Sequence, residues 1–209
     1  MAHSRQSHRQ PHSRLSGSPA ERVIAVARRH FLSHGFRHVT MDELARELGM
    51  SKKTLYASFP SKTTLLESVL AEKFRQVEDD LTRITSHCSS DVLGALRQLL
   101  ACLHHHTDEI KPSFVRDMQR ESQEVFRKVE DRRRTVIQRH FGTVLRAGRK
   151  TGIIRKDIPT DVIVEILLSS VQAIMNPSKI IELNLTPKTG FAAIVTVVLE
   201  GVLADRETR

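Results

Sequence analysis

Two lysines and a threonine stand side by side at Lys52, Lys53 and Thr54, where a short helix is predicted to begin. A lysine ammonium group donates hydrogen bonds to O6 or N7 of guanine, and a threonine methyl group contacts the methyl group of thymine. These three residues are therefore candidates for contact with DNA bases. A solvated helix start is the alternative, although positive charges there oppose the helix dipole, which favours a functional reason for them.

Two predicted helix N-caps, Thr40 and Ser51, are candidates for contact with DNA phosphates. Free N–H groups at a helix N-terminus attract anions, and Lys62 adds positive charge directly after a third predicted cap, Ser61. A purely structural role is the alternative, because Thr40 and Ser51 are needed as caps whatever else they contact.

Two short helices joined by a tight turn must hold these side chains in place. Thr40 and Glu43 fit a capping box at the start of the first helix, and the second helix is predicted over 52–58. Gly49 lies between them and is expected to end the first helix, because glycine adopts positive φ without steric cost. The pattern indicates a helix-turn-helix at about 40–59, whose second helix can lie in the major groove of DNA.

Longer helices are predicted on both sides of this pair. Ser18 as N-cap, Pro19 at the first helical position and Glu21 mark a helix over 19–34, and another is expected over 62–85. A small three-helix core then holds the second short helix at a fixed angle. The predicted core residues are Ile24, Ala27, Phe31, Leu44, Leu48, Leu55 and Phe59.

Charge is unevenly distributed along the 209 residues. The first 70 residues hold eleven Lys and Arg against five Asp and Glu, which is +6 of the formal net charge of +9. A basic chain fits a polyanionic partner, and charge alone does not separate nucleic acid from an anionic membrane. Residues 1–17 combine three of these arginines with Ser, His and Gln, and we expect a flexible basic arm that either enters a minor groove or is an ordinary frayed terminus.

Several classes of protein are excluded by what the sequence lacks. Cys88 and Cys102 have neither metal-site spacing nor the number for a disulfide framework, as expected in a reducing cytosol. No apolar run reaches the roughly 18 residues of a transmembrane helix, and no signal peptide is apparent. No glycine-rich phosphate loop, nucleophile elbow or metal-ligand spacing suggests an enzyme. We therefore expect a cytoplasmic protein that needs no membrane and no cofactor.

The region after residue 90 keeps the helical spacing of apolar residues and shows no alternation typical of strands. The sequence thus predicts an all-α chain of about nine helices, with a flexible arm at 1–17, a DNA-binding domain at 18–70 and a second helical domain at 71–209. The helices expected in the second domain lie at about 90–106, 108–119, 122–150, 160–176 and 187–204.

The last two predicted helices are apolar on nearly all sides. They are too short to span a bilayer, so one face is expected to pack on the chain's own core and the other on a second copy. Central helices of a monomer are the alternative. In a two-fold dimer, the second helix of each helix-turn-helix would be the reading helix that enters the major groove. The two reading helices would lie about 34 Å apart, which is one turn of duplex DNA. The predicted interface residues are Ile163, Ile166, Leu167, Val171, Ile174, Val195, Val198 and Val202.

A set of residues between 21 and about 70 has a familiar spacing, namely Arg22, Ala27, Phe31, Gly35, Phe36, Thr40, Leu44, Ala45, Leu48, Gly49, Met50, Ser51, Thr54, Leu55, Tyr56, Phe59, Ser61 and Lys62. In these positions the chain resembles the tetracycline-repressor (TetR) type of bacterial transcriptional regulator. The resemblance implies phosphate contacts from Tyr56 and Lys62, and packing of the Tyr56 ring is the alternative for that residue. Lys53 departs from the family pattern, in which a small residue is common, and this leaves the operator open.

The resemblance also implies that the second domain dimerises through its last two long helices and binds a small-molecule inducer. Apolar residues of that domain are candidates for the effector pocket, although such residues more often form plain core. No metal site is predicted, because the consecutive histidines at 104–106 point in different directions on a helix. The pocket candidates are Phe74, Leu100, Phe114, Met118, Phe126 and Val129.

Taken together, the sequence favours a transcriptional repressor that binds a palindromic operator in double-stranded DNA as a homodimer and is released by an unknown small-molecule effector. An architectural nucleic-acid-binding protein without an effector is the second hypothesis, and a helical enzyme is the third.

Overall fold

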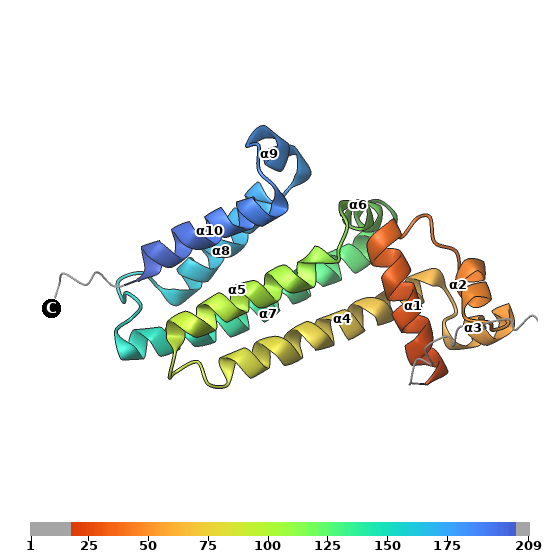
Figure 1. Ribbon diagram of the computed structural model, residues 1–209, viewed down its shortest axis with the longest axis horizontal. Helices are drawn as coiled ribbons and strands as arrows, with labels where there is room; N and C mark the ends of the chain where they lie inside the picture. The colour runs from red at the N-terminus through yellow and green to blue at the C-terminus, as the bar shows by residue number, and fades with distance from the viewer. Residues whose placement is uncertain (1–17, 204–209) are drawn as a thin grey trace, which may run out of the picture.

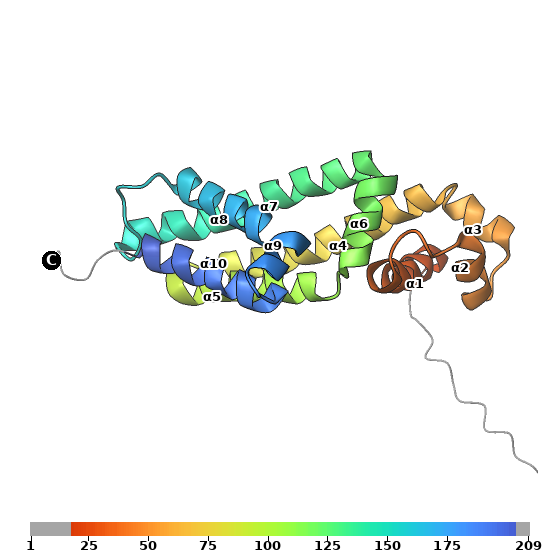
Figure 2. The same cartoon turned by 90° about the horizontal axis from the view of Figure 1, so that it is seen from above.

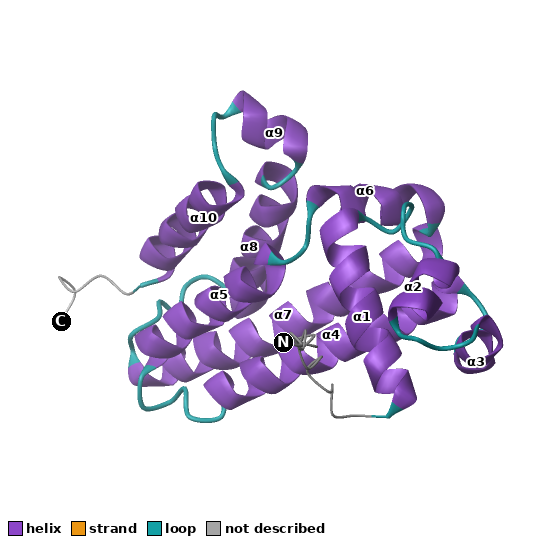
Figure 3. Cartoon of the chain, turned by 45° about the vertical axis from the view of Figure 1, so that its right-hand side comes forward, coloured by secondary structure: helices purple, strands orange, loops and turns teal. Residues whose placement is uncertain are grey.

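The computed structural model describes residues 18–203, over which ten helices follow one another (Figure 1). Within this range no strand is formed, and only an isolated bridge joins Ile154 to Leu203. Figure 3 shows helices linked by loops, so the predicted all-α fold is confirmed. The arm predicted at 1–17 lies outside the described residues. The helices are α1 (Pro19–His34), α2 (Met41–Glu47), α3 (Lys52–Ser58), α4 (Lys62–Thr85), α5 (Val92–Asp108), α6 (Pro112–Glu121), α7 (Gln123–Thr151), α8 (Thr160–Ile174), α9 (Pro177–Glu182) and α10 (Pro187–Val202).

The first four helices begin where their capping residues predict. Ser18 Oγ accepts a hydrogen bond from the Glu21 N–H at 3.2 Å, and the Glu21 carboxylate accepts one from the Ser18 N–H at 2.7 Å. Thr40 and Glu43 form the second capping box, and Gly49 ends α2 with a φ of 63°. These bonds join residues within one turn, so they are encoded locally.

The later helices differ from the prediction at two prolines. The helix expected at 108–119 begins only at Pro112, and Pro177, expected as an interruption, begins the six-residue helix α9. Proline suits the first turn of a helix as well as a break, and the Asn176 side chain caps α9 by accepting from the Lys179 N–H at 2.9 Å. The described chain therefore has ten helices rather than nine.

The short helices α2 and α3 lie at one end of an elongated molecule, and α4 runs from them towards the other end (Figures 1 and 2). Helices α4, α5 and α7 pack on one another, α8 packs on α7, and α10 packs on α8. None of the helices in the described part of the chain is long and apolar enough to cross a membrane.

Two apolar cores support this arrangement. The first core is formed by helices α1, α2, α3 and α4, and it also contains Phe114 and Met118 from α6 and Val125 from α7. The second joins the far half of α4 to α5, α7, α8 and α10. The domain boundary expected near residue 70 therefore falls inside a continuous helix, and α6 completes the core of the DNA-binding domain.

Candidate nucleic-acid interface and effector region

Helix α3 presents most of its surface to solvent. Leu55 is its only buried residue and fixes the helix to the first core, while Lys52, Lys53 and Thr54 are all exposed. The Ser51 hydroxyl accepts from the Thr54 N–H at 3.1 Å, which sets where the helix begins. A helix held on one side with its first turn free has the form that a reading helix needs in a major groove.

The two lysines at this end differ in their surroundings. Lys52 forms an ion pair with Asp42 of α2, whereas Lys53 makes no ion pair within residues 18–203. An exposed pair of this kind contributes little free energy, so Lys52 can exchange Asp42 for another acceptor. Lys53 is therefore the more available donor of the two.

The residues predicted to contact phosphates lie at the same end of the molecule. Thr40 Oγ1 donates to the Glu43 carboxylate at 2.9 Å and accepts from the Glu43 N–H at 3.2 Å. The backbone N–H and hydroxyl of Thr40 lower the pKa of Glu43 because both donate to its charged form. Ser51 is likewise engaged as a cap, so these two hydroxyl groups already have partners, whereas Tyr56 is 45% exposed.

Lys62 is held more firmly than a surface lysine. Its Nζ lies 4.3 Å from the centre of the Phe36 ring and donates to the Arg37 carbonyl oxygen at 3.2 Å. Burial lowers the pKa of Lys62 from its ordinary value. An ammonium group has three donors, so two remain for a phosphate.

The turn after α1 docks the DNA-binding domain on α6. The Arg37 N–H donates to Asp117 Oδ2 at 3.0 Å, and the Lys111 N–H donates to the Leu32 carbonyl oxygen at 3.1 Å. Gly35 has a φ of 91°, and a Cβ atom there would lie 2.6 Å from Asp117 Oδ2. Asp117 was not predicted for this role, because its partners lie about eighty residues away in the sequence.

A buried charged cluster also joins the two domains. Lys73, on the inward side of α4, pairs with Glu109 and lies 3.0 Å from His106 Nδ1, while Arg28 of α1 pairs with Glu109 at 2.6 Å. Burial lowers the pKa of Lys73. Burial alone would raise the pKa of Glu109, but hydrogen bonds from Arg28 and Lys73 outweigh it and lower that pKa. The one sequence signal for this cluster was a lysine four residues after the apolar Val69 on an amphipathic helix.

The residues predicted to form an effector pocket do not gather in one cavity. Phe114 and Met118 lie in the first core and Phe126 packs against it, because α6 covers the DNA-binding domain. Phe74 and Val129 line an open groove of about 220 Å³ between α4 and α7. Leu100 lines a different space, in the second core. Of the six candidates, only Phe74 and Val129 therefore line the same space, and their role in effector binding stays a prediction.

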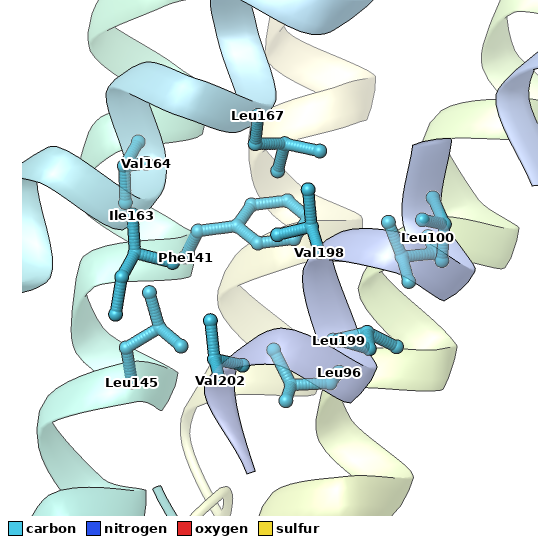
Figure 4. Close-up of a pocket in the computed structure, with 11 residues that line it drawn as sticks. Leu96, Leu100, Phe141, Leu145, Ile163, Val164, Leu167, Val198, Leu199 and Val202 are labelled. Carbon is cyan, nitrogen blue, oxygen red and sulfur yellow. The ribbon is translucent and has the colours of Figure 1, made fainter. Parts of the chain in front are cut away.

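Leu100 faces an internal space of about 10 Å³ between α5, α7, α8 and α10 (Figure 4). This is room for about one water molecule, but every lining side chain is apolar and offers no hydrogen bond. The lining residues are Leu96, Leu100, Phe141, Leu145, Ile163, Val164, Leu167, Val195, Val198, Leu199 and Val202.

Comparison with known proteins identifies the family of the DNA-binding domain. Residues 23–69 match the model of the bacterial regulatory proteins of the tetR family, and this range contains both helices of the helix-turn-helix. The N-terminal domain of the chain is a TetR-family DNA-binding domain. The chain is a DNA-binding transcriptional regulator, and the expectation of a regulator rather than an enzyme is confirmed.

The similarity to transcriptional regulators extends beyond the matched domain. The uncharacterized HTH-type transcriptional regulator YvaF of Bacillus subtilis is 25% identical over 192 residues, which are 90% of this chain and 97% of YvaF. Among solved structures, a transcriptional regulator from Cytophaga hutchinsonii has a TM-score of 0.72 at 18% identity over 88% of this chain and 98% of its own. SmeT, the repressor of the Stenotrophomonas maltophilia multidrug efflux pump SmeDEF, has a TM-score of 0.66 at 16% identity, over 90% of this chain and 92% of SmeT. The two structures show the fold.

The residues predicted for the dimer interface divide into three sets by their burial in the chain. Ile163, Leu167 and Val202 are buried in the chain's own core, so they offer little surface for contact with a second copy. Ile166, three residues after Ile163 on α8, is 50% exposed. A helix that is apolar all round carries no signal for which face turns inward, and tertiary packing decides it. The remaining predicted residues are half-buried against the second core, namely Val171, Ile174, Val195 and Val198.

The three consecutive histidines point in different directions, as their spacing predicts. His104 lies 3.4 Å from Asp108, His105 is exposed, and His106 is buried beside Lys73. They share no common site.

Proposed function

We propose that this TetR-family regulator is a repressor that reads a palindromic operator as a homodimer. Residues 18–70 would supply the DNA contacts, and residues 71–209 the dimer interface and the effector site. The exposed first turn of α3 carries the proposal, since Leu55 anchors the helix while Lys52, Lys53 and Thr54 are all exposed to solvent. We assign the base contacts to these three residues.

We assign the phosphate contacts to Thr40, Ser51, Tyr56 and Lys62. Thr40, Ser51 and Lys62 lie at the starts of α2, α3 and α4, where helix dipoles favour a negative charge, and Tyr56 lies further along α3. The exposed Tyr56 hydroxyl and the held ammonium group of Lys62 are donors without sequence preference. Phosphate contacts of this kind fix the register of the protein on DNA, and base contacts supply the specificity.

We infer that the second copy packs on the outer faces of α8 and α10. Val162, Ile166 and Val197 are 45%, 50% and 71% exposed there, and such apolar exposure on neighbouring helices favours a partner of the same kind. Ile166→Glu should convert the dimer to monomers in sedimentation experiments. Ile181→Glu, on α9 and 79% exposed, is the matched control and should leave the dimer intact.

We infer that the effector is a small apolar molecule that enters the region around the space in Figure 4. The wholly apolar lining supports this class, and the core must open to admit a ligand because the space holds about one water. SmeT, which has the same fold, has been solved in complex with triclosan. We also expect a cytoplasmic location, since bacterial chromosomal DNA lies there.

Selection of genomic DNA fragments on the purified protein tests the proposal. We expect recovery of fragments that share a two-fold symmetric sequence, with a symmetric footprint. Recovery of random fragments would contradict specific repression and favour an architectural nucleic-acid-binding protein. Genes beside the selected fragments then narrow the chemistry of the effector, which should release the DNA in a gel shift.

Two lysine variants separate base reading from phosphate binding on the selected operator. Lys53→Ala should lower the preference for operator over random DNA by about 1–3 kcal/mol. Lys62→Ala should weaken binding to operator and to random DNA alike. It should also reduce the slope of log affinity against log salt concentration by about one. Lys156→Ala, an exposed lysine beyond α7, is the control. Equal loss of specificity in all three would refute the assignment of α3 as the reading helix.

A further inference from the structure

Helices α4 and α5 bring an aspartate, a cysteine and a histidine together away from the DNA-binding end. Cys102 and His106 are four residues apart on α5 and therefore lie on one face of that helix. Asp80 of α4 faces them, and the carboxylate oxygen, the sulfur and the imidazole nitrogen all lie within 4.8 Å of one another. Among residues 18–203, no other group of three such side chains is this close.

These three groups are typical ligands of zinc-like ions. Thiolate, imidazole and carboxylate all bind Zn²⁺, with bonds of about 2.0–2.3 Å, and imidazole and thiolate also accept Co²⁺ and Ni²⁺. Ligand atoms in a tetrahedral site of that size lie about 3.3–3.8 Å apart. The three atoms lie at most 4.8 Å apart, so side-chain movements of about 1 Å bring them to this spacing without a change in the helices.

We propose that Asp80, Cys102 and His106 form a three-ligand site for a divalent transition-metal ion of the zinc class. Three protein ligands leave a fourth tetrahedral position for water, which is the composition of an exchangeable site rather than a closed structural one. The Asp80 side chain is 36% exposed, so an ion can enter from solvent.

Binding replaces contacts that the metal-free chain already has. His106 Nε2 lies 2.8 Å from Asp80 Oδ2, and the ion takes the place of this hydrogen bond. The Cys102 thiol releases its proton to solvent as the sulfur–metal bond forms. Asp80 Oδ1 stays paired with Arg83, which leaves the other oxygen directed at the site.

The neighbouring cations limit the affinity but do not block the site. Lys73 Nζ lies 3.0 Å from His106 Nδ1, the ring nitrogen that must carry the proton when Nε2 binds metal. Lys73 also pairs with Glu109, so its long side chain can turn to that carboxylate and leave the imidazole. We therefore expect weaker binding than at a four-ligand site.

Cobalt titration of the full chain, after treatment with a chelator, tests the site. We expect one Co²⁺ per chain and a sulfur-to-cobalt charge-transfer band. Cys102→Ser should abolish the band, and Cys88→Ser should keep it, because Cys88 lies buried outside the cluster. Asp80→Asn and His106→Gln should each weaken binding by at least about tenfold, since even ligand-supporting residues contribute that much.

Absence of the band in the unmodified chain, or its persistence in Cys102→Ser, would overturn the site. Far-UV circular dichroism establishes that each variant is folded. Asp80→Asn keeps the test valid if a core variant unfolds, because Asp80 is partly exposed. Neither readout uses DNA, so failure of this site leaves the proposed repressor function untouched.

Discussion

Replacing Gly35 by alanine tests how the DNA-binding domain is docked on α6. Gly35 has φ 91° and ψ 159°, a combination that only glycine adopts readily and that costs other residues about 1–3 kcal/mol. The added Cβ would also lie 2.6 Å from Asp117 Oδ2. Asp117 must then move, which breaks or lengthens the 3.0 Å hydrogen bond that it accepts from the Arg37 N–H. Such a bond contributes about 1 kcal/mol to the free energy of unfolding.

The two effects predict a loss of about 3 kcal/mol in the free energy of unfolding. For a chain of this length, that corresponds to a Tm lower by roughly 10 °C. Gly49→Ala is the matched control, because Gly49 also has positive φ but has no atom within 4 Å of the added Cβ. Its cost should be only about 1 kcal/mol.

Thermal denaturation at one fixed protein concentration measures both variants. Combining Gly35→Ala with Asp117→Ala removes the crowded carboxylate, so the double variant should be more stable than the sum of the two single losses predicts. Equal losses for Gly35→Ala and Gly49→Ala, together with simple additivity of the two substitutions, would refute the role given to Asp117.

Three further predictions concern the charged and capping residues. Glu109→Ala should cost about 2 kcal/mol in urea denaturation because it leaves the buried ammonium group of Lys73 without its carboxylate, a loss moderated by the partial exposure of Glu109, whereas Lys73→Met should cost under about 1 kcal/mol. Burial, together with the charge of the adjacent arginine, keeps the pKa of His140 below its ordinary value of about 6.5, so the unfolded chain binds that proton first and stability is lost as pH falls below 6.5. Urea denaturation at a series of pH values should show a smaller loss for His140→Gln and an unchanged loss for the exposed control His105→Gln. Thr40→Ala should lower the free energy of unfolding by about 1 kcal/mol, with Thr40→Ser close to the original chain in the same assay.

The features predicted correctly from the sequence are local. The capping boxes at Ser18 and Thr40 and the positive φ of Gly49 depend on residues within one turn. The residue types at these positions are therefore sufficient to predict them. The exposed start of α3 follows from the same signals, since only Leu55 in that helix has a core to enter.

The features that were missed depend on contacts between distant residues. Ile163 and Ile166 are the same residue type on one apolar helix, yet only Ile163 turns inward, and no pattern within α8 distinguishes them. Helix α6 covers the first core. Its Phe114 and Met118, which were predicted to line an effector site, are therefore buried in that core. Asp80 and Cys102 are 22 residues apart, and only the antiparallel packing of α4 on α5 brings them together.

The unbroken course of α4 makes it a lever arm. Its 24 residues span about 36 Å, from the cap at Ser61 beside α3 to the far end of the second core. A tilt of about 5° at the far end therefore displaces the near end by about 3 Å. In the proposed dimer, two such displacements change the separation of the reading helices by up to about 6 Å, against the 34 Å of one duplex turn. An effector that opens the second core by a small angle would thereby put both helices out of register with their half-sites.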